Sequence, residues 1–296
     1  MNPMNEIQLH TALDRARRFL EEGKLLHAMQ VYTHLLDVAP DLEEPYVRLA
    51  QICVDVGRSE RAEEILRSGS ERDPENAVFM SMLGDLYLRC GRYEEAITCL
   101  RQIPDRRLPT VHYTIGLAAM HLRRWSEAEQ EFRAVILLDS RWSRAYEALG
   151  EVLLQRRQYS EAIRELERGL RLEPYSGTGN RLAGIARLNR LELPKALEHL
   201  TLAVDIDPDD AEAWQLCGDV LLRMRRFEEA EPYLRRALRL NPQSADASAD
   251  MGYLCLHRGD TRRALDAFNR ALELQPGHPR AVDGKLHLRI QRKRVL

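Results

Sequence analysis

Apolar residues recur along this chain at spacings of three and four, in successive pairs of short segments. This spacing places the apolar side chains on one face of an α-helix. The pattern is clearest between Ala211 and Ser244. Pro242 cannot continue a helix, so this stretch predicts two amphipathic helices joined by a tight turn. Their two apolar stripes consist of Trp214, Cys217, Gly218, Leu221 and Leu222, and of Phe227, Ala230, Leu234, Ala237 and Leu238.

Small residues within these stripes indicate how the two helices pack. Gly218 has no side chain, so a neighbouring helix can approach its backbone closely. Ala230 and Ala237 alternate with large residues, which lets side chains of one helix enter the gaps of the other. A single pair would leave one apolar face in water, and stacking successive pairs buries it. Such a stack predicts first helices along an inner, concave surface and second helices along an outer one.

The pattern recurs with a period of about 34 residues along nearly the whole chain. The sequence therefore predicts one all-α repeat domain over residues 1–296. Its eight repeats span about 9–42, 43–76, 77–108, 109–142, 143–176, 177–210, 211–244 and 245–278, and a capping helix follows at 279–296.

The capping helix carries a stripe and a basic surface. Val282, Leu286 and Ile290 recur at a spacing of four and are expected to cover the last exposed face of the stack. A solvated tail is one interpretation of the basic surface, and a patch for nucleic acid or acidic lipid is the other. The basic residues are Lys285, Arg289, Arg292, Lys293 and Arg294.

Two repeats depart from the pattern. Pro104 arrives four residues early, so the second helix of the third repeat is expected to end near Ile103. This shortening indicates either a shorter connection with unchanged stacking or a step that separates repeats one to three from the rest. In the sixth repeat Asn180 stands where an aromatic residue usually lies, and Gly177 and Gly179 weaken the helix, so we expect the loosest internal joint there.

The spacing of Trp214, Gly218, Leu221, Ala230 and Pro242 resembles that of tetratricopeptide-repeat proteins. The resemblance implies a right-handed α–α superhelix, or solenoid, whose concave groove binds an extended or helical segment of another protein. It further implies a scaffold or adaptor, not a catalyst, of the kind that often serves secretion or assembly machinery in bacteria. The sequence lacks both the residue set with which chaperone-binding members grip a terminal carboxylate and the asparagine ladder of the long sugar-transferase superhelix.

The resemblance also implies which first-helix positions face the groove. In the third and fourth repeats these positions give an apolar strip that contains an aromatic residue. Exposed apolar area in a concave site favours partner binding, whereas packing between adjacent first helices is the alternative. The inward residues are Val78, Thr110, Tyr113, Leu117 and His121, with Met82 beside them. The next groove residues are Arg144, Glu147, Glu151 and Arg181.

In the seventh and eighth repeats the groove positions are acidic. They comprise Glu212, Gln215, Asp219, Asp246 and Asp250. Carboxylates on one surface repel each other, and Arg181 and Arg223 are expected to neutralise only part of the charge. We therefore predict that this end receives a basic segment, with a solvated acidic face as the alternative. The predicted partner is a protein segment that carries basic and apolar residues.

Composition indicates the class of partner and the cellular location of the protein. The net charge of −2 draws the chain neither to nucleic acid nor to a membrane. The amino terminus has no charged-then-apolar run, and the apolar runs are far shorter than the ~20 residues of a membrane helix. The five cysteines form no CxxC and are expected to be reduced thiols. We therefore predict a cytoplasmic protein of bacterial type.

Motifs for chemistry are missing from the sequence. It contains no HExxH, no CxxC and no GxxxxGK[ST], so we expect no catalytic residue, no cofactor, no metal and no small-molecule substrate. The first hypothesis is a non-catalytic protein-binding scaffold. The alternatives are a self-assembling structural protein, which would be a homo-oligomer, and the targeting arm of an enzyme carried on another chain. Direct RNA binding through the basic tail is a further hypothesis.

Overall fold

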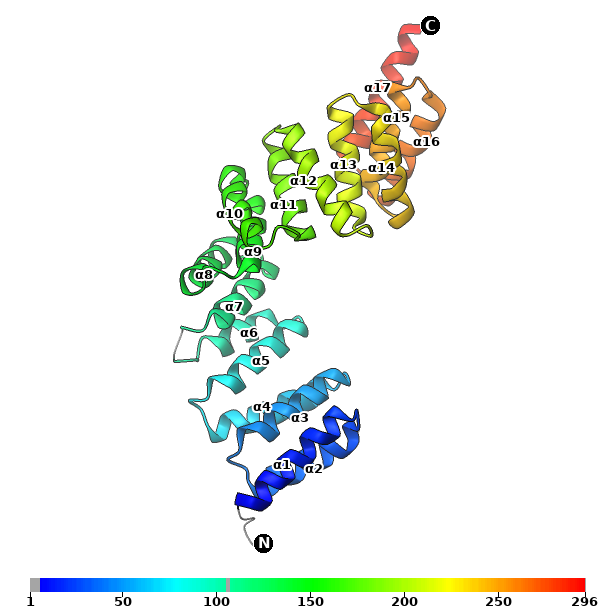
Figure 1. Cartoon of the computed structure of the whole chain (residues 1–296). Helices are drawn as coiled ribbons and strands as arrows, with labels where there is room; N and C mark the ends of the chain where they lie inside the picture. Colours follow the sequence, from blue (N-terminus) through cyan, green and yellow to red (C-terminus); the bar gives the residue numbers. More distant parts are fainter. Residues whose placement is uncertain (1–5, 105–106, 296) are drawn as a thin grey trace. The chain divides into compact units, whose positions relative to one another are not determined.

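The computed structural model describes residues 6–104 and 107–295 (Figure 1). This part of the chain contains seventeen α-helices and no strand. The contacts divide the chain into two units, Met1–Ser140 and Arg141–Leu296. Unit 1 contains α1 (Glu6–Glu21), α2 (Leu25–Val38), α3 (Glu43–Asp55), α4 (Ser59–Arg72), α5 (Ala77–Arg89), α6 (Tyr93–Leu100), α7 (Pro109–His121) and α8 (Trp125–Leu138). Unit 2 contains α9 (Ser143–Gln155), α10 (Tyr159–Leu172), α11 (Gly177–Asn189), α12 (Leu193–Ile206), α13 (Ala211–Arg223), α14 (Phe227–Leu240), α15 (Ala245–His257), α16 (Thr261–Leu274) and α17 (Pro279–Val295).

Successive helices pack in pairs, each pair within one of the sequence repeats, from α1–α2 to α15–α16. The predicted fold class, an all-α solenoid of helix–turn–helix repeats, is confirmed. Inside unit 1, α3 contacts α5 and α5 contacts α7; inside unit 2, α9, α11, α13 and α15 contact one another in turn. No two second helices make such contacts over the described residues. The first helices of each unit therefore lie closer together and share one surface, which we call the first-helix face.

A glycine in the first helix allows the close approach within most repeats. A Cβ added at Gly252 would lie 2.5 Å from Cε1 of Phe268, and one at Gly218 would lie 2.6 Å from Cγ of Leu234. Real Cβ contacts are essentially never this short, so the side chain of the second helix occupies the space that glycine leaves. The same clash would arise at Gly84, Gly116, Gly150 and Gly184.

The turn between the two helices uses a left-handed backbone conformation in all eight repeats. Glycine adopts it in four of them, with φ between 71° and 78°. In the other four repeats a residue with a side chain adopts this conformation; Leu191, for example, has φ 60°. Only glycine adopts this region without steric cost. The positions are Gly23, Gly57, Gly91, Arg123, Arg157, Leu191, Arg225 and Gly259.

Replacing Leu191 with glycine should therefore raise the free energy of unfolding by about 0.5–1 kcal/mol, because relief of the left-handed strain exceeds the extra chain entropy of glycine. Urea unfolding followed by circular dichroism would measure the change. Arg190→Gly is the matched control, since Arg190 has φ −89° and gains no such relief. Equal effects of the two substitutions would show that Leu191 is unstrained.

The first turn of several first helices is tied to the preceding repeat by one side-chain donor. Tyr46 Oη donates to the carbonyl of Pro40 at 3.0 Å, and Trp214 Nε1 donates to that of Pro208 at 3.0 Å. In the sixth repeat Asn180 Nδ2 donates to the corresponding Pro174 carbonyl at 3.1 Å. The asparagine therefore replaces the aromatic residue by making the same hydrogen bond.

The early proline shortens one helix and leaves the stacking in place. α6 ends at Leu100, close to the expected Ile103, and has 8 residues where the other second helices have 14. α7 still contacts both α5 and α6 within unit 1, so repeats three and four remain packed. Asp105 and Arg106 of the connecting segment lie outside the described residues.

The capping helix buries a different face from the one that we predicted. Ala281, Gly284 and Leu288 are buried against α15 and α16. The stripe of Val282, Leu286 and Ile290 is instead 49%, 53% and 46% exposed. The face that contains Gly284 is buried because glycine has no side chain there, and the ring of Phe268 occupies the space. The side chains beyond residue 290, which include three of the five predicted basic residues, lie outside the described part.

Candidate protein-binding site

In unit 1, the predicted apolar strip lies on the neighbouring helices α5 and α7. Val78 is 39% exposed, whereas Met82 and Leu117 are partly buried. Tyr113 packs edge-on against Phe132 at a centroid distance of 5.7 Å. The strip therefore combines packing with exposed apolar area. His121 is exposed and stacks on Tyr93 of α6 at 4.4 Å, so it contacts the preceding helix pair.

In unit 2, α9 presents the charged groups Arg144, Glu147 and Glu151, and the charge of Arg144 acts on Glu147 of the same helix. Arg144 is exposed, and Glu151 is partly buried. Glu147 is half-buried, and burial raises the pKa of its carboxyl, although a hydrogen bond with Ser176 and the charge of Arg144 oppose the rise. A half-buried carboxylate whose burial is only partly compensated is an electrostatic cost that a further positive charge on a bound partner would relieve.

Arg181 of α11 bridges to the next repeat. Its Nε lies 2.9 Å from an oxygen of Asp210, and its Nη1 pairs with Glu212. Arg181 therefore neutralises part of the acidic surface, as the sequence indicated. Glu212 itself is exposed.

The carboxylates of α13 and α15 converge on an arginine of α17. Nη1 of Arg280 lies 2.6 Å from Oδ1 of Asp219 and 2.5 Å from Oδ1 of Asp250. The side chain of Asp250 is fully buried and that of Asp219 is 5% exposed. The guanidinium lies 5.2 Å from the ring of Tyr253. We call these four residues the arginine cluster.

Further contacts complete the acidic end. Gln215 donates to Asp250 at 2.5 Å, and Arg223 donates to Asp219 at 3.0 Å. His278, which precedes α17, lies 2.9 Å from Asp246. The basic group at the predicted acidic site therefore comes from the chain itself.

Arg280 is not among the residues that the sequence predicted for this site, although the repeat register points to it. Continuing the repeat register into the last helix makes Pro279 position 1 and Arg280 position 2, which is one of the groove-facing positions.

Burial raises the pKa of Asp250 to about 7, while Arg280 opposes this rise. Because the cation is already in place, Asp219 and Asp250 are closed to a partner unless α17 moves.

Comparison with protein families identifies repeats along the chain. A family model described as tetratricopeptide repeat matches residues 83–145, 113–177, 147–211 and 218–279, and a second model with the same description matches 19–78. The chain belongs to the tetratricopeptide-repeat family. Proteins of this family are generally non-catalytic, and their fold is typical of protein–protein interaction scaffolds. No curated protein sequence matches the chain.

Several solved structures resemble this tetratricopeptide-repeat chain. A crystal structure of the APC/C hetero-tetramer Cut9–Hcn1 is 17% identical over 96% of the chain with a TM-score of 0.67, and the chain spans only 57% of that relative. A tetratricopeptide-repeat protein from Parabacteroides merdae is 17% identical over 83% of the chain and 97% of its own length, with a TM-score of 0.62. YrrB is 22% identical over 65% of the chain and 97% of its own length, with a TM-score of 0.52.

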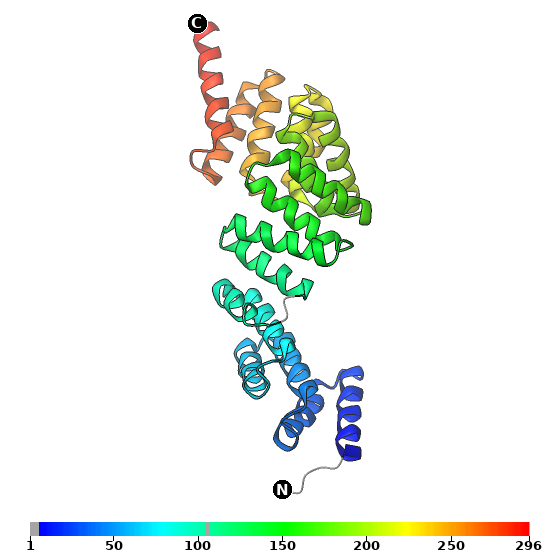
Figure 2. The same cartoon turned by 90° about the vertical axis from the view of Figure 1, so that its left-hand side faces the viewer.

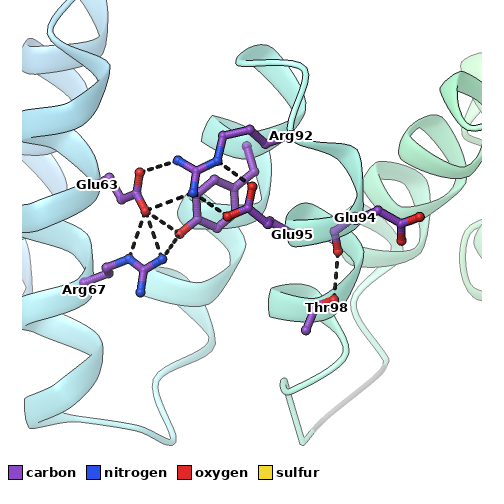
Figure 3. Close-up of polar contacts among 7 residues, drawn as sticks. Glu63, Arg67, Arg92, Glu94, Glu95 and Thr98 are labelled. Carbon is purple, nitrogen blue, oxygen red and sulfur yellow. Dashed lines mark hydrogen bonds and ion pairs between the residues drawn. The ribbon is translucent and has the colours of Figure 1, made fainter.

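The second helices of this tetratricopeptide-repeat chain carry a charged cluster of their own in unit 1 (Figure 3). Glu63 of α4 accepts hydrogen bonds from Arg67 at 2.9 Å and from Arg92 at 2.5 Å, and Arg92 also pairs with Glu95. The bond from Arg92 lowers the pKa of Glu63. These charges are matched within the cluster, which borders a cavity of about 370 Å³ lined by α4, α5 and α6. We therefore interpret the cluster as a link between successive repeats.

The described residues meet neither the requirements of a metal site nor those of a membrane-spanning helix. Among them, no group of three or more His, Cys, Asp or Glu side chains is placed to hold a metal ion. None of their helices is long and apolar enough to cross a bilayer. All five cysteines are free, and Cys53 and Cys217 are buried.

Proposed function

We propose that this chain is a non-catalytic scaffold that binds a segment of a partner protein on the first-helix face of unit 2, chiefly on α9 and α11. The half-buried carboxyl of Glu147 carries the proposal, because Ser176 and Arg144 offset its burial only in part, so that its pKa stays raised and a bound basic side chain would relieve the remaining cost. Glu151 and Arg144 flank it on the same helix. A segment with basic and apolar residues fits this surface best.

Two structural relatives support the proposal. The Cut9–Hcn1 structure is a hetero-tetramer, and YrrB is described as having an unusual peptide-binding site. The acidic residues of α13 and α15 contribute less, because Arg280 occupies Asp219 and Asp250. Five free cysteines are typical of a reducing compartment, which supports the cytoplasm as the proposed location.

Replacing Glu147 and Glu151 together with glutamine should abolish partner capture without lowering the melting temperature, since a neutral amide is cheaper to bury than a carboxylate. The immobilised full chain would be incubated with lysate, and bound proteins quantified by mass spectrometry. The matched control replaces Glu198 with Gln and Asp205 with Asn, two exposed carboxylates of α12. Equal capture by both double variants would show that α9 is not the binding surface.

The same samples separate the other hypotheses. Concentration-dependent growth in light scattering, with no foreign protein captured, would favour a self-assembling structural protein. Co-purification with an enzyme whose activity follows the captured chain would favour a targeting arm. Capture that disappears after nuclease treatment would favour nucleic acid.

A further inference from the structure

One side of α17 packs on the preceding helix pair, and the opposite side is exposed. In a complete repeat, the second helix covers the equivalent of this exposed side. Continuing the repeat register from Pro279 makes Ala281, Gly284 and Leu288 positions 3, 6 and 10, and all three are buried against the preceding pair. Figure 2 shows α17 in red beside the orange α15–α16 pair. α17 therefore packs on the preceding repeat in the manner of the first helix of a ninth repeat.

In a complete repeat, positions 4, 8 and 12 of the first helix contact its own second helix. In the seventh repeat, Trp214 at position 4 lies 5.3 Å from the ring of Tyr233. Leu222, at position 12, belongs to one buried cluster with Leu234 of α14. The equivalent residues of α17 are Val282, Leu286 and Ile290, which are 49%, 53% and 46% exposed.

The described part of the chain does not supply a second helix for this face. Other first helices of unit 2 have 13 residues and then turn, whereas α17 continues as a helix for 17 residues, from Pro279 to Val295. It is therefore still helical at position 15, where every other repeat turns back. The apolar stripe stays uncovered along its described length.

Two features of the stripe specify its occupant. Leu286 stands at position 8, where six repeats have glycine, so the facing helix needs a small residue in place of the usual Leu or Phe. Lys285 and Arg289 flank the stripe and have no ionic partner among the described residues. Acidic residues beside the small one would complement them, whereas a second copy of α17 would bring like charges together.

We propose that the stripe of Val282, Leu286 and Ile290 binds an amphipathic helix of a partner protein, which has a small residue against Leu286 and acidic residues toward Lys285 and Arg289. This surface is distinct from the first-helix face. The partner helix takes the place that a second helix has in the complete repeats. The stripe has three aliphatic residues and no aromatic anchor, so a protein helix fits it better than a lipid surface does.

A peptide with the sequence of α8 provides a probe of this chemistry. Trp125–Leu138 is a second helix with three glutamates and one arginine, and Phe132 is its residue that faces a first-helix glycine. A labelled, stapled form with Phe132→Ala should bind the full chain saturably in fluorescence anisotropy. The form that retains Phe132 should bind about tenfold more weakly, because its ring meets Leu286.

Leu286→Glu should weaken binding of the alanine peptide at least about tenfold while the melting temperature stays unchanged. Leu172→Glu is the matched control, since Leu172 is an exposed helical leucine of α10 in the same unit. Failure of the peptide to saturate, or equal binding to both variants, would overturn the proposal. So would a wild-type dimer that Leu286→Glu dissociates, or adsorption to anionic vesicles that this substitution removes.

Discussion

Replacing Arg280 with alanine should lower the free energy of unfolding of unit 2 by about 3–5 kcal/mol. The substitution leaves Asp250 fully buried and Asp219 almost so, without the cation that lies 2.5 and 2.6 Å from them. Removing one partner of a buried pair costs far more than losing a surface pair, because the remaining charge stays desolvated. Equilibrium urea unfolding of the full chain would measure the change.

The control and the pH dependence make this prediction specific. Arg223→Ala should cost less than about 1 kcal/mol, because Arg223 is 43% exposed and its ion-pair partner among the described residues is Asp219 of its own helix. Burial raises the pKa of Asp250 to about 7. Between about pH 4 and 7 the folded protein therefore binds the extra proton, and the contribution of Asp250 to stability falls as the pH rises through that range.

The loss caused by Arg280→Ala should accordingly be larger at pH 8 than at pH 5, where protonation of Asp250 removes the uncompensated charge. A loss that is equal at both pH values, or no greater than that of Arg223→Ala at pH 8, would show that the arginine cluster does not anchor α17. Hydrogen exchange of the α15 amides would report whether the loosening is local.

Gly218→Ala should destabilise unit 2 by about 1–3 kcal/mol, because the added methyl group would lie 2.6 Å from Cγ of Leu234. Gly177→Ala is the control. Its added carbon would lie no closer than 3.5 Å to any neighbour, and alanine favours a helix more than glycine does, so this variant should be neutral or slightly more stable. Thermal unfolding would compare the two.

A double-mutant cycle with Leu234→Ala isolates the contact. In that background the space above Gly218 is vacated, so Gly218→Ala should cost little or should stabilise the protein. If the cost of Gly218→Ala were the same in both backgrounds, its origin would lie elsewhere than in the approach of α14 to α13.

Local periodicity predicted the helices and the close approach at the first-helix glycine of six repeats, because these depend on residues within one 34-residue period. The capping helix was harder to predict. Val282, Leu286 and Ile290 are the more apolar stripe, but Gly284 allows the closer approach to Phe268, so the smaller residues are buried. Hydropathy alone cannot rank a close approach above a larger apolar surface.

Two further features depend on more than residue type. The left-handed turn at Leu191 follows from the position in the repeat, since leucine itself disfavours that conformation. Arg280 pairs with Asp219 across 61 residues of sequence, and this contact appears only when the repeat register is carried into the final helix.

That long separation has a consequence for how the carboxyl-terminal helices unfold. In a repeat array, each pair normally senses only its neighbours, so a terminal segment can fray while the pair before it stays intact. Arg280 joins α17 to α13 as well as to α15. Detachment of the last helix therefore releases the charges of two repeats at once, and this end should open in one cooperative step instead of helix by helix.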